Sequence, residues 1–132
     1  MIRQFFSLLS LSAVALASCG CDGSSYDAPL DAPVQIAAEQ SAVFEGGKLE
    51  VKFTGIATDS RCPSDVTCVW AGEVVARLAV RNDGRTTQHE IKEAQNASVG
   101  GYTITLLQVL PARSSSQPIA AADYRVTLKI TR

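Results

Sequence analysis

Apolar and polar residues alternate one by one along several short segments after residue 33, and this pattern constrains the fold more than any other feature of the chain. The two clearest segments, residues 48–54 and 124–131, have apolar residues at Leu49, Val51 and Phe53, and at Tyr124, Val126, Leu128 and Ile130. Successive side chains of a β-strand point to opposite faces, so each segment is expected to bury one face. The alternation predicts antiparallel strands with one face in water.

Five further segments are predicted strands: residues 34–38, 41–45, 73–81, 86–91 and 102–110, the last ended by Pro111. Glu-Gly-Gly-Lys at 45–48 and Asn-Asp-Gly-Arg at 82–85 are predicted hairpin turns. About seven strands at roughly ten-residue spacing predict an all-β fold, an antiparallel β-sandwich or small barrel. No segment has the pattern of a convincing amphipathic helix; residues 91–97 are the best candidate, with a single turn or loop as the alternative. Residues 111–123 are predicted to form a long surface loop.

The first eighteen residues have the composition of a secretory signal peptide. Arg3 supplies one positive charge, and residues 5–17 are apolar or small without a charged side chain. This run is shorter than the about 20 apolar residues that cross a bilayer. Residues 1–18 are therefore expected to be removed rather than to remain as a transmembrane helix.

Leu16-Ala17-Ser18-Cys19 resembles the lipobox of bacterial lipoproteins. The resemblance implies cleavage before Cys19, acylation of that residue and attachment to the cell envelope through a lipid anchor. If the host is Gram-negative, the sorting pattern of such lipoproteins and Gly20 after the cysteine imply the periplasmic face of the outer membrane. Ordinary cleavage after Ala17 is the alternative.

The chain is thus expected to have three parts. Residues 1–18 are the signal peptide, residues 19–33, rich in Gly, Ser, Asp and Pro, are a flexible tether, and residues 34–132 are the β-domain. Cys21 lies in the tether without an assigned role.

Residues 59–73 contain two cysteines and the single Trp of the chain. In an exported protein, Cys62 and Cys68 are expected to form a disulfide that closes a short loop. Asp-Ser-Arg-Cys-Pro at 59–63, followed by Val-x-Cys-x-Trp-Ala-Gly-Glu at 66–73, resembles a family of small, largely uncharacterised bacterial lipoproteins and secreted β-domains. The resemblance implies an envelope location and a β fold, and it brings no activity with it.

Two interpretations of this loop differ in the role of Trp70. In the structural one, which we favour on sequence grounds, Trp70 is a core anchor, Gly72 permits close packing, and Arg61 pairs with Asp59 or Glu73. In the functional one, the disulfide stiffens a binding loop and so lowers the entropy cost of binding. That binding loop would comprise Arg61, Ser64, Asp65, Val66, Thr67 and Trp70.

Composition and motifs restrict the function further. A net charge of -1 gives no basic surface for nucleic acid, and the single His, His89, lies in a strand pattern without a nucleophile motif. We therefore expect a noncatalytic protein without cofactor or metal, which binds or supports another envelope protein. The alternatives are a protease inhibitor that presents the disulfide loop and a small-ligand or calcium-binding module, with Asp59, Asp65 and Glu73 as candidate calcium ligands.

Overall fold

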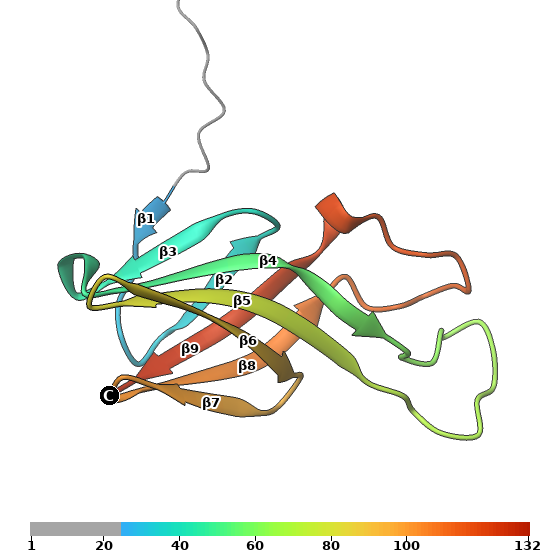
Figure 1. Ribbon diagram of the computed structural model, residues 1–132. Coiled ribbons are helices and arrows are strands. Elements are labelled where there is room, and N and C mark those ends of the chain that lie inside the picture. The colour runs from blue at the N-terminus through green and yellow to red at the C-terminus, as the bar shows by residue number, and fades with distance from the viewer. Residues whose placement is uncertain (1–24) are drawn as a thin grey trace, which may run out of the picture.

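The polypeptide forms nine β-strands in two sheets that pack face to face, as seen in a computed structural model that describes residues 25–132 (Figure 1). The first sheet has the order β1 (Ser25–Asp27), β3 (Ser41–Phe44), β4 (Leu49–Asp59), β5 (Val74–Asn82) and β6 (Arg85–Lys92). The second has the order β2 (Pro33–Ala37), β9 (Arg125–Thr131), β8 (Tyr102–Leu110) and β7 (Asn96–Val99). Short 3₁₀ turns, η1 (Glu45–Gly47) and η2 (Ala121–Asp123), complete the described elements. The predicted all-β sandwich is confirmed.

The core lies between the two sheets, and the alternating residues supply it. Leu49, Val51 and Phe53 of β4 are fully buried, and so are Val126, Leu128 and Ile130 of β9. Burial of one such side chain stabilises the fold by about 1.5–3 kcal/mol. The period-two pattern therefore identified both the strands and their inward faces.

The two predicted hairpin turns are also confirmed. Asp83 and Gly84 join β5 to β6 with φ of 50° and 75°, values that suit the two-residue turn matching the twist of paired strands. Residues 45–48 join β3 to β4, whose antiparallel ladder includes Phe44 opposite Leu49. In this second turn Gly46 and Gly47 have a φ of 68° and 92°, as the glycines of the sequence predicted.

Residues 91–97, the best helix candidate in the sequence, form no helix but the end of one strand, a turn and the start of another. Ile91 and Lys92 are the last two residues of β6. Asn96–Val99 form β7, an edge strand that the sequence pattern did not predict. Ala94 turns the chain between them with a φ of 66°, and its N–H donates to the Leu106 carbonyl oxygen at 2.8 Å. Asn, Ala and Ser have low β propensity, so this strand forms because β8 pairs with it.

The sandwich also includes residues that the sequence pattern assigned to the tether. Ser25–Asp27 form β1, which pairs in parallel with β3, and Ala28 is buried. The predicted signal peptide, Cys19 and Cys21 lie outside the described residues. Within residues 25–132, no helix has the length and apolar character needed to cross a membrane.

Candidate functional site

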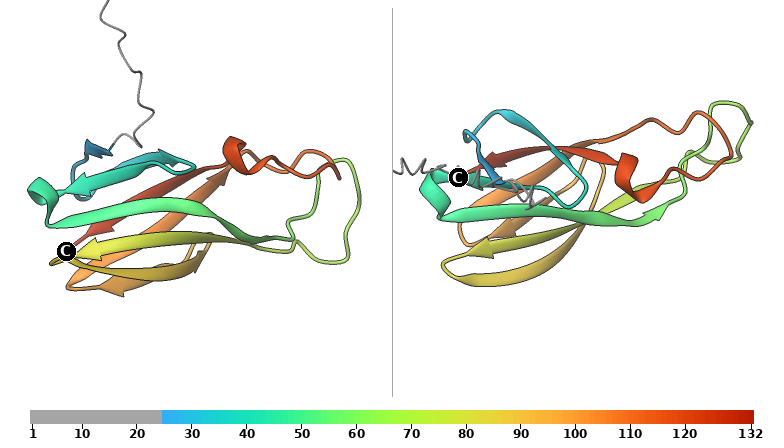
Figure 2. Two further views of the ribbon diagram at one scale, coloured as in Figure 1. Left: turned by 45° about the horizontal axis from the view of Figure 1, so that its top comes forward. Right: turned by 90° about the horizontal axis from the view of Figure 1, so that it is seen from above.

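Two long connections extend together from one end of the sandwich (Figure 2). We call residues 60–73, between β4 and β5, the cysteine loop, and residues 111–120, after β8, the second loop. Ser64 joins them, because its N–H donates to the Arg113 carbonyl oxygen at 3.1 Å and its Oγ donates to the Ser114 carbonyl oxygen at 3.1 Å. The predicted surface loop after Pro111 therefore supports the cysteine loop.

The neck of the cysteine loop continues the pairing of β4 with β5. The Ser60 N–H donates to the Glu73 carbonyl oxygen at 2.8 Å, and the Cys62 N–H donates to the Ala71 carbonyl oxygen at 2.9 Å. Beyond this neck, Cys62 and Cys68 form the predicted disulfide, with their Cα atoms 5.9 Å apart. Residues 63–70, which we call the tip, are thus enclosed by the backbone hydrogen bonds of the neck, and the disulfide closes residues 62–68 within the loop.

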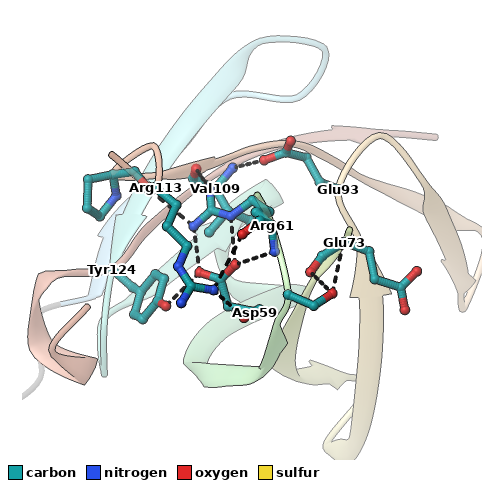
Figure 3. A network of polar contacts seen from close by, with 9 residues as sticks. Asp59, Arg61, Glu73, Glu93, Val109, Arg113 and Tyr124 are labelled. Atoms are coloured by element: carbon teal, nitrogen blue, oxygen red, sulfur yellow. Dashed lines mark hydrogen bonds and ion pairs between the residues drawn. The ribbon is translucent and has the colours of Figure 1, made fainter. Parts of the chain in front are cut away.

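Arg61 fixes the neck to the second sheet (Figure 3). Its Nε and Nη2 donate to the two carboxylate oxygens of Asp59 at 2.9 and 2.7 Å. Its Nη1 and Nη2 also donate to the carbonyl oxygens of Val109 and Pro111 at 3.1 and 3.2 Å. The guanidinium group therefore connects the end of β4 to the end of β8, with the bidentate geometry that favours arginine over lysine.

Two further side chains complete this network. The Tyr124 hydroxyl donates to Asp59 Oδ2 at 2.8 Å, and Arg113 Nη1 donates to the Asp59 carbonyl oxygen at 3.0 Å. The hydrogen bonds from Arg61 are the main cause that lowers the pKa of Asp59 to about 2. Burial, together with Asp59, raises the pKa of Tyr124. Asp59 is thus a charged acceptor held by groups from three parts of the chain.

The tip of the loop carries exposed apolar side chains. Val69 is 93% exposed, Trp70 is 79% exposed and Val66 is 48% exposed. The expectation that Trp70 anchors the core is therefore wrong, because the loop carries it beyond the end of the sandwich. Trp70 stays a candidate binding residue.

The other predicted site residues divide between the neck and the tip. Asp65, Val66 and Thr67 lie exposed at the tip, while Arg61 is in the neck and Ser64 contacts the second loop. Arg61 pairs with Asp59 rather than with Glu73, which instead pairs with Lys92 at 2.8 Å.

Residues of the site that were not predicted from the sequence are Val69, at the tip, and Arg113 and Tyr124, in the supporting network. Val69 could have been found as one of two adjacent large apolar residues within a turn-rich segment. Arg113 and Tyr124 could not, because they are 54 and 65 residues from Asp59 in sequence.

The candidate calcium ligands do not come together. The Asp59 carboxylate already accepts hydrogen bonds from Arg61 and Tyr124, and the Glu73 carboxylate forms an ion pair with Lys92. In the described part of the chain, no three His, Cys, Asp or Glu side chains are grouped as a metal site would need. His89 Nε2 lies 2.8 Å from Thr87 Oγ1 of the same strand.

No protein-family model, curated protein or solved structure matches the chain. In the described part of the chain, the exposed apolar tip of the cysteine loop, supported by the Arg61 network, is the best candidate for a binding surface.

Proposed function

We propose that this chain is a lipid-anchored protein of the bacterial envelope that binds another envelope protein, without catalysis, through the tip of the cysteine loop. One observation carries the binding role: Val69 and Trp70 are adjacent, largely exposed, and lie between the disulfide at Cys68 and the neck hydrogen bond to Ala71. A large aromatic side chain left in water costs free energy that a partner would recover by covering it. Tryptophan is also among the residues enriched at the energetic centre of protein interfaces.

The support beneath the tip favours binding as well. The disulfide, the hydrogen bonds of the neck and the Arg61 network restrict the loop before any partner arrives. A loop that is already ordered loses less conformational entropy on binding, so more of the contact energy appears as affinity. Such a scaffold would equally suit a loop that enters a protease cleft, so a protease is one class of partner to test.

The position of the tip fits an anchored protein that reaches outward. Ser25, the first described residue, lies level with Ser41 in β3 and hence with Lys52 in β4. Asp59, where the cysteine loop begins, is seven residues further along β4, which at the usual rise is about 20 Å. Figure 1 shows β1 and the cysteine loop toward opposite ends of the sandwich. An anchor before β1 leaves the tip free to meet a partner.

Intact mass spectrometry of the protein from native membranes tests the anchor. We expect a chain that begins at Cys19 and carries a lipid-sized mass addition, and we expect reduction to add two protons for Cys62 and Cys68. A chain that begins at Ser18 without lipid would contradict the proposed anchor.

Site-specific photo-crosslinking in native membranes tests the binding role. A photoreactive residue at Val69 is expected to give a discrete protein adduct that Trp70→Ala abolishes. The matched control is the same residue at Lys48, which is exposed at the opposite end of the sandwich and should give no such adduct. Adducts with lipid alone, or identical adducts from both positions, would contradict a protein-binding tip.

A further inference from the structure

The two sheets of the sandwich have four edges, and three of them are protected against pairing with another strand. β1 and β7 have only three and four residues. β2 begins at Pro33, which has no N–H, and the Tyr26 hydroxyl donates to the Gln35 carbonyl oxygen at 2.6 Å. Short strands, proline and blocked carbonyls are the usual means by which proteins prevent edge pairing.

The fourth edge, β6, has none of these three features, and its charged residues Arg85, Glu90 and Lys92 leave residues 86–89 without a Lys, Arg, Asp or Glu. It runs for eight residues in unbroken register with β5, without proline, glycine or bulge. Figure 2 shows β6 at the margin of its sheet, and in the described part of the chain β5 is its one paired neighbour. A long, regular and unpaired edge of this kind is a template for another strand.

The register identifies which backbone groups are free. The pairing at the two ends of the ladder shows which residues of β6 bond to β5. At one end Asn82 and Arg85 flank the two-residue turn, and beyond the other end the Glu93 N–H donates to the Val74 carbonyl oxygen. In an antiparallel pair every second residue exchanges hydrogen bonds with its neighbour, so the odd-numbered residues of β6 bond to β5. The N–H and C=O groups of Thr86, Gln88 and Glu90 point away from the sheet, and all three residues are exposed.

We propose that two copies of this chain associate through β6, in antiparallel orientation and with Gln88 of one copy opposite Gln88 of the other. This register also pairs Thr86 with Glu90 and Glu90 with Thr86, so each free backbone group of one copy meets one from its partner. No two like charges lie opposite each other among these residues. A two-fold axis at residue 90 instead of 88, which slides one strand past the other by four residues, would oppose the two Glu90 carboxylates, and like charges directly opposite destabilise a strand pair.

The pairing forms one continuous sheet of ten strands from two five-stranded sheets. Its two-fold symmetry is that of the commonest protein dimers, in which the same surface of both copies is used. The inference depends on neither the proposed lipid anchor nor the proposed binding role of the cysteine loop.

Sedimentation equilibrium of the full chain in density-matched detergent tests the dimer. We expect the wild type to approach twice the monomer mass as concentration rises, and Gln88→Pro to remain a monomer. The Gln88 N–H does not bond to β5, so proline there is expected to spare the monomer fold. Gln88→Thr keeps the N–H and is the matched control that should still dimerise. A wild type that stays monomeric, or a Gln88→Pro chain that still dimerises with an unchanged melting temperature, would overturn the proposal.

Oxidative crosslinking tests the register. Residues at a hydrogen-bonded antiparallel position have Cα atoms about 5.5 Å apart, within the range of a disulfide. Gln88→Cys is therefore expected to give a covalent dimer whose link maps to residue 88 in both chains by mass spectrometry. Thr86→Cys on the same edge would be displaced from its copy by four residues, about 13 Å along the strand, and should not crosslink to itself. Equal yields from the two variants would contradict the proposed pairing.

Discussion

Gly72 and Ser60 face each other across the neck of the cysteine loop so closely that a β-carbon on Gly72 would lie 1.8 Å from the Ser60 carbonyl oxygen. Gly72 also has a φ of 71°, a conformation that residues with a β-carbon rarely adopt. On the other strand, Ser60 Oγ accepts a hydrogen bond from the Glu73 N–H at 3.0 Å. The neck therefore has no room for a side chain at residue 72.

Gly72→Ala is expected to lower the free energy of unfolding by about 3 kcal/mol or more, because it adds a backbone clash to the strain of a positive φ. Gly84→Ala is the matched control. Gly84 has a φ of 75°, but a β-carbon added there would have no atom within 4 Å, so this change should cost about 1 kcal/mol. Urea unfolding of both variants measures the difference. Equal losses would show that the neck can open to admit a methyl group.

The Asp59–Arg61 pair predicts a dependence of stability on pH. The pKa of Asp59 is about 2 in the folded protein against an ordinary value of 3.8. A lowered pKa means that the charged form is stabilised by folding, so the contribution is fully present above about pH 4. It is lost as the pH falls from 3.8 toward 2. Allowing for partial screening by solvent, we expect a loss of about 1–2 kcal/mol from this group.

Asp59→Asn isolates that contribution. At pH 7 it should lower the free energy of unfolding by about 1–3 kcal/mol, because Arg61 loses its charged acceptor. At pH 2.5 the difference from wild type should become smaller. Glu39→Gln removes the exposed ion pair with Lys52 and should cost about 0.5 kcal/mol or less at either pH. If the Asp59→Asn difference stayed constant between pH 7 and 2.5, titration of Asp59 would not be its cause.

The disulfide is expected to shape the loop more than it stabilises the domain. The sequence separation of Cys62 and Cys68 is six residues, and loop-closure entropy for so small a ring is about 2 kcal/mol. The Cys62→Ser, Cys68→Ser double variant should therefore stay folded, with far-ultraviolet circular dichroism unchanged and a lower melting temperature. Loss of the β signal on reduction would instead indicate that the disulfide is required for the fold.

Much of the sandwich was predictable because burial along a strand leaves a local pattern. Val51 and Phe53 alternate with Lys52, and the Asp83-Gly84 turn needs residues that accept a positive φ. β7 was not predictable, because its Asn, Ala and Ser residues pair with β8 through backbone groups that every sequence shares. Local pattern therefore identifies strands that bury large side chains and misses those that do not.

The disulfide of the site was predictable from the sequence, and the exposure of Trp70 was not. Cys62 and Cys68 have a spacing that suits a disulfide in an exported protein. Whether Trp70 enters the core depends on the direction in which the loop leaves the sandwich. That direction is fixed by the bonds from Arg61 to Val109 and Pro111, which are 48 and 50 residues away in sequence. No local pattern carries this information.

The exposure of Trp70 leads to a direct spectroscopic prediction, because it is the single tryptophan of the chain. Its fluorescence in the folded protein should resemble that of tryptophan in water and should be quenched strongly by iodide. Trp70→Ala should change the free energy of unfolding by about 0.5 kcal/mol or less, as expected for a side chain outside the core. Phe53→Ala, at a fully buried position, should cost about 3–5 kcal/mol and is the matched control. Blue-shifted, unquenched emission from the isolated protein would show that Trp70 is covered, and would contradict a tip that is free to bind a partner.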